Sequence, residues 1–290
     1  MRKGIVLAGG TGSRLYPTTT AVNKHLLPVY DKPMIYYSLS VVMLAGIRNI
    51  LLISNPGDLS QFQQLFQDGK HLGLDISYAS QERPRGIAEA VIIGREFIGD
   101  DSVALILGDN ILFGAGLSGR LRAHESDENA VVFSYKVKDP GRYGVVEIDD
   151  HGRARSIEEK PARPKSNLAV TGLYFYPNDV IEIAGKLTPS ARDELEITDV
   201  NRVYMNQGRL TVEYLSRGYA WLDAGTEAAL LEASNFVATI QVRQDLKIGC
   251  VEEIAWRMGW IDTQQLVSLG RRMKGSAYGD YVAMLADEPR

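Results

Sequence analysis

GIVLAGGTGSRL, residues 4–15, takes the chain from an apolar run into a glycine-rich turn that ends on an arginine. The apolar run, residues 4–7, predicts a buried strand. Glycines in a strand-to-helix turn let backbone N–H groups approach an anion closely, and the dipole of a following helix favours negative charge. The stretch therefore predicts a phosphate-binding turn that carries its own positive charge at Arg14. A tight turn with an incidental surface arginine is the alternative.

Two familiar phosphate-binding patterns fail in this turn. The dinucleotide pattern GxGxxG would need glycine at position 15, where the chain has Leu15, and GxxxxGK[ST] occurs nowhere in the sequence. The first failure counts against a dinucleotide-dependent oxidoreductase. A second cation, Lys24, lies ten residues after Arg14. Arginine can clamp a phosphate with two hydrogen bonds, whereas lysine acts as a point charge, so the pair favours the phosphate-binding interpretation.

The alternation of apolar runs and helix-period segments indicates an α/β fold. Continuous apolar strands separated by helices are typical of a parallel sheet covered on both faces, which binds ligands at the carboxyl ends of its strands. After about residue 128 shorter connections suggest strands added as a meander, followed by helical segments. We expect a Rossmann-like, mostly parallel mixed sheet covered by helices, with a helical C-terminal appendage. The predicted strands are 4–7, 49–54, 74–79, 102–107, 130–137, 144–148, 154–158, 170–176 and 210–215, and the predicted helices 33–45, 59–66, 88–97, 179–186, 197–207, 226–245 and parts of 252–290.

Composition excludes several classes of protein. The formal net charge of −4 argues against a nucleic-acid binder. One cysteine, Cys250, and four histidines supply neither a disulfide framework nor a zinc cluster. The chain passes from Met1 almost directly into a strand, which leaves no room for a signal peptide, and its longest apolar region, residues 34–47, is too short to span a bilayer. We expect a cytoplasmic protein with no membrane partner.

The chain resembles the sugar-phosphate nucleotidyltransferases. The opening turn continues as GGTGSRLYP at 9–17 and KHLLPV at 24–29, and further blocks follow in order over residues 4 to about 262. These blocks look like the branch of the family that forms dTDP-glucose. They are YDKPMIYY at 30–37, LGDN at 107–110, YGVVE at 143–147, EEKP at 158–161, VTGLYFY at 170–176, EITDVN at 196–201 and WLDAGT at 221–226.

The resemblance implies substrates and a role for each matching residue. The substrates would be dTTP and glucose 1-phosphate, and the metal Mg²⁺. The implied catalytic residues are Arg14, Lys24 and Lys160. Those implied to bind the nucleotide are Leu7, Gly9, Gly10, Thr11, Gly12, Ser13, Arg14, Lys24, His25, Gln81, Gly86 and Asp109, with Gln81 and Gly86 facing the base. Those implied to surround the sugar phosphate are Gly144, Glu159, Lys160 and Val170, and those implied to hold the metal are Asp109 and Asp223.

Several of these residues also have plain structural interpretations. Asp109 follows a buried strand, where a carboxylate can hold a hard cation, but an aspartate there can also cap a loop. Asp223 ends a short apolar run, and spacing alone does not bring it to Asp109. Glu159 and Lys160 would be a solvated ion pair in most proteins. Only the resemblance gives these residues their implied roles.

Three departures from the family pattern gather on the implied nucleotide side. The family usually has Gln where this chain has His25, and Asp and Gln where it has Arg85 and Glu89. Arg85 and Glu89 are four residues apart, so they could form a compensating surface pair worth a few tenths of a kcal/mol. Otherwise the changes tune recognition of the base or the sugar. The alternatives are therefore the same chemistry with UTP, or with a modified or amino sugar 1-phosphate.

The resemblance also implies a division of the chain and an assembly. Residues 1–240 would form the nucleotidyltransferase domain, with the sugar-phosphate-binding part from about 130, and residues 241–290 an appendage for oligomer or effector contacts. Relatives form homotetramers, so a homo-oligomer is expected. A catalytically silent regulator that binds nucleotide sugars is the alternative from another class, although the retained Asp109 and Asp223 argue against it. Feedback control and the downstream pathway stay open.

Overall fold

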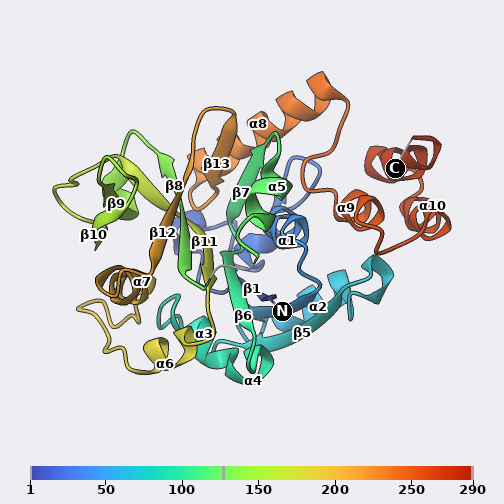
Figure 1. The fold of residues 1–290 in the computed structure, drawn as a ribbon. Coiled ribbons are helices and arrows are strands. Elements are labelled where there is room, and N and C mark those ends of the chain that lie inside the picture. Colours follow the sequence, from blue (N-terminus) through green and yellow to red (C-terminus); the bar gives the residue numbers. More distant parts are fainter. Residues whose placement is uncertain (1, 126–127, 289–290) are drawn as a thin grey trace.

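The computed structural model describes residues 2–125 and 128–288 (Figure 1). Among these residues nine strands form one sheet, and one half of it is parallel. The parallel strands lie in the order β6-β1-β4-β5, so that Val6 pairs with Leu52 on one side and Ile106 on the other. They are β1 (Arg2–Ala8), β4 (Asn49–Ser54), β5 (Asp75–Ser80) and β6 (Ser102–Leu107).

The other half of the sheet is mostly antiparallel. Its strands are β8 (Ala130–Lys136), β9 (Gly144–Ile148), β10 (Ala154–Glu159), β11 (Leu168–Tyr176) and β12 (Leu210–Leu215). The expected meander is correct for β9 and β10 but wrong for the rest. Strand β11 is nine residues long and buried after its first residue, so it takes partners along both edges. It pairs with β9 and then β6 on one edge and with β8 on the other, and β12 adds in parallel to β8.

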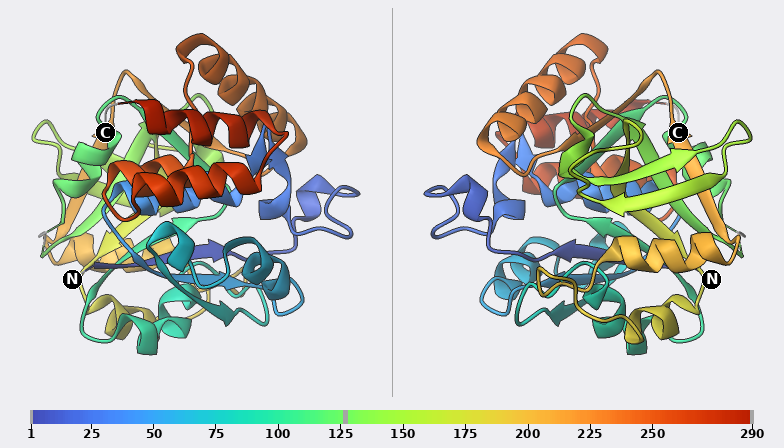
Figure 2. Two further views of the ribbon diagram at one scale, coloured as in Figure 1. Left: turned by 90° about the vertical axis from the view of Figure 1, so that its right-hand side faces the viewer. Right: turned by 90° about the vertical axis from the view of Figure 1, so that its left-hand side faces the viewer.

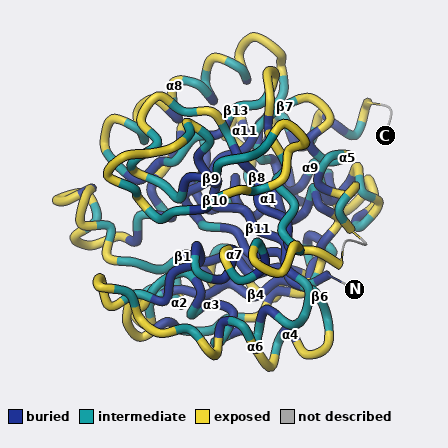
Figure 3. The backbone as a smooth tube through the Cα atoms, turned by 60° about the vertical axis from the view of Figure 1, so that its left-hand side comes forward, coloured by how far each residue is buried: buried dark blue, intermediate teal, exposed yellow. Residues whose placement is uncertain are grey.

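Helices cover both faces of the sheet, as the sequence predicts (Figure 1). Successive residues of β1 pack on opposite faces of the sheet. Val6 lies in the buried cluster that includes α1 and α2, whereas Ile5 lies in the cluster that includes α3, α6 and α7. Figure 3 shows the buried strands running through the interior. These helices and their small neighbours are α1 (Ile35–Leu44), α2 (Leu59–Phe66), α3 (Glu89–Ile93), α4 (Arg95–Ile98), α5 (Leu117–Arg122), α6 (Val180–Gly185) and α7 (Ile197–Asn206).

Two predicted helices differ from the observed ones. The helix expected at 33–45 begins at Ile35, because β3 (Lys32–Pro33) pairs with β2 (Pro28–Val29). The helix expected at 88–97 is divided at Gly94 into α3 and α4. A Cβ at Gly94 would lie 2.7 Å from Cδ1 of Ile5, so this segment passes too close to the sheet for a larger residue.

A pair of strands that the sequence does not predict lies beside the main sheet. Strand β7 (Asn110–Gly114) pairs antiparallel with β13 (Tyr219–Asp223). The two segments are more than a hundred residues apart, so no local pattern links them. Their pairing places the end of β13 against the start of β7, next to the carboxyl end of β6.

The C-terminal helices pack on the body of the molecule (Figure 2). Helix α9 contacts α1, and Trp256 of α9 belongs to the same buried cluster as α1 and α2. Helix α8 continues through residue 240, where the domain boundary is predicted; that division of the chain stays a prediction. The helices are α8 (Glu227–Gln244), α9 (Val251–Arg257), α10 (Thr263–Arg272) and α11 (Ala277–Met284), and the short 3₁₀ turns are Ser13–Leu15, Lys24–Leu26, Lys70–Leu72, Pro140–Arg142 and Leu285–Asp287. Within the described residues, no helix combines the length and apolar character that crossing a membrane requires.

Candidate active site

The glycine-rich turn leaves β1 at the carboxyl edge of the parallel strands. Gly10 and Gly12 have φ values of 97° and 61°, in the region that favours glycine. Thr19 Oγ1 donates a 2.8 Å hydrogen bond to the Gly12 carbonyl and so fixes the far side of the turn. Glycine is therefore required at these two positions by the conformation of the backbone, and Arg14 follows directly after the turn.

A pocket of about 190 Å³, the turn pocket, opens beside this turn. Eight of the predicted nucleotide-binding residues line it: Leu7, Gly9, Gly10, Lys24, His25, Gln81, Gly86 and Asp109. Thr11, Gly12 and Ser13 do not line it. Its remaining walls come from residues to which the sequence assigned no role: Pro84, Ile87, Leu107 and Glu194.

A second pocket of about 270 Å³, the carboxylate pocket, adjoins the first. The predicted residues that line it are Arg14, Asp109, Gly144, Glu159, Lys160, Val170 and Asp223. Ile87, Leu107 and Asp109 line both pockets, so the two share a wall. Arg14 lines the carboxylate pocket and not the turn pocket, although it was expected to bind the nucleotide.

Asp109 is the carboxylate at the junction of the pockets. It follows β6 and Gly108, and it is 7% exposed. Lys24 Nζ lies 2.5 Å from its Oδ2, and Asn110 Nδ2 donates to its Oδ1 at 2.9 Å. Burial alone would raise the pKa of Asp109, but Lys24 and these hydrogen bonds outweigh burial and hold it below its usual value. Asp109 is therefore ionised at neutral pH.

Asp223 reaches the same place through the β7–β13 pair. It lies opposite Asn110 in the register, and the next residue, Ala224, donates its backbone N–H to the Asp109 carbonyl at 3.1 Å. Burial and the negative charge of Asp109 raise the pKa of Asp223, while Lys24 and Arg14 oppose that rise. The structure thus brings together two carboxylates that the sequence alone could not connect.

The charges at this junction suit a hard cation. Among the described residues no group of three or more metal-ligating side chains occurs. Mg²⁺ usually binds through one or two carboxylates together with water and substrate phosphates, so Asp109 and Asp223 match the ligands that a protein usually contributes. The raised pKa of Asp223 fits the same picture, because a carboxylate pair gains from a cation placed between its members.

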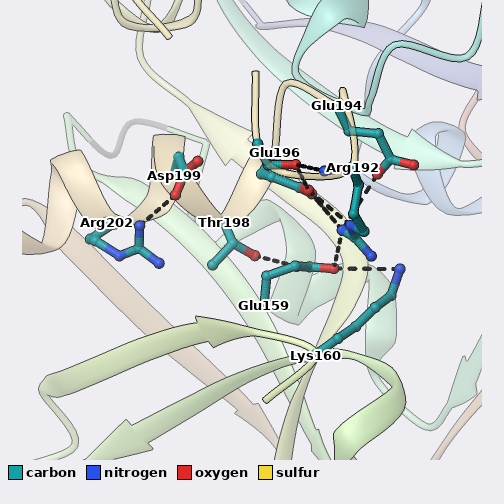
Figure 4. A network of polar contacts seen from close by, with 9 residues as sticks. Glu159, Lys160, Arg192, Glu194, Glu196, Thr198, Asp199 and Arg202 are labelled. Carbon is teal, nitrogen blue, oxygen red and sulfur yellow. Dashed lines mark hydrogen bonds and ion pairs between the residues drawn. The ribbon is translucent and has the colours of Figure 1, made fainter. Parts of the chain in front are cut away.

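Glu159 lines the carboxylate pocket and is held by a network of polar contacts (Figure 4). Thr198 Oγ1 donates to its Oε2 at 2.6 Å, and Arg192 Nη2 donates to its Oε1 at 3.3 Å. Lys160 Nζ lies 3.6 Å from the same Oε1, and its side chain is 48% exposed. The charge pair predicted for Glu159 and Lys160 is formed, and both residues face the pocket.

Sequence reasoning missed several residues of this pocket. Thr198 and Arg142 line it, and Arg192 reaches it through Glu159. Thr198 lies inside the EITDVN block and Arg142 directly precedes YGVVE, so their places in the resemblance could have indicated them. Arg192 lies in the segment before EITDVN, and its contact with Glu159 depends on tertiary structure.

His25, the first departure from the family pattern, is fully buried in the turn pocket. Its Nδ1 lies 2.8 Å from Asn23 Oδ1, and the amide nitrogen of Asn23 is bonded to Asp58. Burial, with help from the neighbouring Lys24, lowers the pKa of His25 to about 3. The ring is therefore neutral at physiological pH, as the amide of a glutamine would be.

The other departures, Arg85 and Glu89, do form the expected pair. Arg85 Nη1 lies 3.7 Å from Glu89 Oε1. The two ends of the pair differ, since the side chain of Arg85 is 56% exposed and that of Glu89 only 16%. Only the Arg85 end of the pair is therefore at the surface.

Comparison with known families identifies the class of protein. The model of the nucleotidyl transferase family matches residues 3–240. This chain belongs to the nucleotidyl transferase family. Its fold and its two pockets at the carboxyl edge of a parallel sheet agree with that membership.

The chain is also similar to individual members of the family. The chain is 57% identical over 285 residues to glucose-1-phosphate thymidylyltransferase of Mycobacterium tuberculosis H37Rv, covering 98% of this chain and 99% of that protein. It is 56% identical to the glucose-1-phosphate thymidylyltransferase of Neisseria meningitidis over 98% of this chain and 99% of the relative. Among solved structures, a putative glucose-1-phosphate thymidylyltransferase from Bacillus anthracis is 40% identical with a TM-score of 0.75, covering 81% of this chain and 95% of that one. UDP-glucose pyrophosphorylase complexed with UDP-glucose has a TM-score of 0.73 at 25% identity, covering 82% of this chain and 99% of that one.

Proposed function

We propose that this protein transfers a thymidylyl group from dTTP to glucose 1-phosphate, forming dTDP-glucose and releasing pyrophosphate. The observation that carries the proposal is the shared wall of the two pockets. Gly9, Gly10 and Lys24 line the turn pocket, Glu159 and Lys160 line the carboxylate pocket, and Asp109 borders both. A nucleotide in one and a sugar phosphate in the other would meet at Asp109. The names of the relatives support this choice of substrates.

The reaction needs positioning more than proton transfer. An oxygen of the sugar phosphate would attack the α-phosphorus of dTTP, forming a P–O bond while the bond to pyrophosphate breaks. A phosphomonoester has a second pKa of about 6 and is already anionic at neutral pH, so no general base is required. Catalysis would come from holding two anions together and stabilising the charge that develops.

The cations of the site are distributed for that task. Lys24 borders the turn pocket, where it would meet the triphosphate, and Lys160 borders the carboxylate pocket, where it would meet the sugar phosphate. Arg14 also lines the carboxylate pocket and lies beside Asp223, since a Cβ at Gly225 would be 3.0 Å from Arg14 Nη2 and 2.9 Å from Asp223 Oδ1. Glu159, oriented by Thr198, would accept hydrogen bonds from sugar hydroxyls.

We also propose that Asp109 and Asp223 hold Mg²⁺ when substrates bind. The ion would supply positive charge at the phosphates. We expect chelation by EDTA to abolish pyrophosphate release and added Mg²⁺ to restore it. Asp223→Asn should weaken activation by Mg²⁺ while leaving the fold intact. Activity that survives complete removal of divalent ions would contradict the proposal.

The experiment that tests the function is a grid of pyrophosphate release. dTTP, UTP, CTP, ATP and GTP are each combined with glucose 1-phosphate, glucosamine 1-phosphate and galactose 1-phosphate, with Mg²⁺ present. We expect dTTP with glucose 1-phosphate to dominate. Preference for another pair would overturn the substrate assignment and favour UTP or an altered sugar. Absence of turnover, with binding of a nucleotide sugar retained, would favour the silent regulator.

The proposed assembly follows from the resemblance only, and the proposed location from the sequence features described above. We propose a homotetramer in the cytoplasm, whose product supplies the synthesis of rhamnose or another deoxysugar. Sedimentation velocity on the full chain gives the assembly. A monomer at micromolar concentration would contradict it.

A further inference from the structure

We propose that Glu89 is a positioning residue for the nucleotide base, acting through the amide of Gln81. The inference rests on the proposed function, in which the turn pocket receives the base of a nucleoside triphosphate. Glu89 does not line that pocket, whereas Gln81 does. Glu89 would therefore act on the base without touching it.

The contacts of Gln81 carry the inference. Its side chain is buried, and its Nε2 donates to Glu89 Oε2 at 2.9 Å and to the Gly86 carbonyl at 3.3 Å. Both N–H groups of the amide thus have an acceptor within the protein. The amide oxygen faces the glycine turn, because a Cβ placed on Gly9 would lie 2.8 Å from Gln81 Oε1.

The chemistry of residue 89 makes this orientation obligatory. A carboxylate accepts hydrogen bonds and donates none, so only the nitrogen of Gln81 can face Glu89. A glutamine at position 89 could instead accept or donate. With glutamate, the wall of the turn pocket presents an acceptor, which suits a pyrimidine with a ring N–H such as thymine or uracil. The carboxylate also makes the stronger, charge-assisted bond.

The pair with Arg85 does not account for the burial of Glu89. The Arg85 contact is the longer one, at 3.7 Å, and goes to Oε1, while the Gln81 contact goes to Oε2. The surface ion pair therefore involves only Oε1 of Glu89. The other oxygen, Oε2, is the one that orients Gln81 for base recognition.

The test is a double-mutant cycle on the full chain, with dTTP affinity measured by calorimetry. Glu89→Leu removes the acceptor and should weaken dTTP binding about tenfold. Glu89→Gln retains an acceptor and should stay within about threefold of the parent. Arg85→Leu removes only the exposed partner and is the matched control, expected within about twofold. Thermal unfolding of each variant shows whether it is folded.

The second half of the cycle, in which Gln81 is also replaced, distinguishes an effect through Gln81 from a general disturbance of the site. In a Gln81→Leu background, Glu89→Leu should cause no further loss of dTTP affinity, and the KM for glucose 1-phosphate should be unchanged in Glu89→Leu alone. Equal losses in both backgrounds, unchanged affinity in Glu89→Leu, or a parent protein that does not bind dTTP would each overturn the inference. A parent protein that binds dTTP without turnover would overturn the proposed reaction and leave this inference open to support from the same cycle.

Discussion

At the scale of single residues, replacing Arg14 should affect activity but not stability. Its side chain is exposed and lines the carboxylate pocket, so the fold does not depend on it. We expect Arg14→Ala to lower kcat by about 10²–10³, equivalent to about 2.7–4 kcal/mol in the barrier, as does loss of one preorganised charge donor. The free energy of unfolding should change by less than about 0.5 kcal/mol.

Arg153→Ala provides the control for this prediction. Arg153 is an exposed arginine whose partner, Asp149, lies outside both pockets. Its replacement should leave kcat unchanged. Steady-state kinetics and urea unfolding measure the two quantities, and a parental kcat in Arg14→Ala would refute a role for this charge in the reaction.

His25 makes stability depend on pH. Its pKa falls from 6.5 in the unfolded chain to about 3 in the folded protein. Between these values the unfolded chain binds the extra proton, so the free energy of unfolding falls as the pH falls, by about 1.4 kcal/mol per unit. Between pH 6 and 4, His25→Gln should have a shallower dependence by about that slope. Urea unfolding at stepped pH measures both slopes, and parallel curves would show that His25 is protonated in the folded state.

At the scale of elements, the loop before α3 is fixed by the loop before α7. Leu195 donates its backbone N–H to the Arg85 carbonyl at 2.7 Å and accepts from Ala88 at 3.2 Å. Gly86 lies between these bonds with a φ of 103°, and a Cβ there would be 2.3 Å from the Leu195 carbonyl oxygen. The base side of the turn pocket is therefore set by contact between two loops.

Gly86→Ala tests this contact. The left-handed backbone and the clash together should cost about 2–4 kcal/mol in the free energy of unfolding and should raise the KM for dTTP. Gly152 is the matched control, since its φ is 76° and no atom lies within 4 Å of a Cβ there. Gly152→Ala should cost only about 1–2 kcal/mol and leave KM unchanged. Equal costs in the two variants would mean that the loops separate freely.

The elements show how far local sequence determines structure. The parallel strands β1, β4 and β6 could be predicted, because short continuous apolar runs are typical of strands that are buried on both faces of a parallel sheet. Strands β7 and β13 could not, because each is short and gains stability only from a partner far along the chain. The same limit applies to the site. The glycine turn and Asp109 follow from local pattern, whereas the approach of Asp223 to Asp109 and of Arg192 to Glu159 requires the tertiary fold.

At the scale of the whole molecule, the C-terminal helices share the core of the sheet domain. Trp256 is 2% exposed and lies in one buried cluster with Phe66 of α2 and Val42 of α1. Lys32 strengthens the junction, since its Nζ donates to the Ile248 carbonyl at 2.9 Å. Residues 241–288 should therefore not unfold independently of the rest of the chain.

This cooperativity can be measured with the chain's three tryptophans. In Trp221→Phe, fluorescence reports only Trp256 and Trp260, whereas far-UV circular dichroism reports every helix and strand. We expect both signals to give one urea midpoint, and Trp256→Ala to lower the free energy of unfolding by about 3–5 kcal/mol. Leu231→Ala on the exposed side of α8 is the control, expected within about 0.5 kcal/mol. A fluorescence midpoint below that of circular dichroism would show a separately folding tail, because the shared cluster would then contribute too little to couple the two parts.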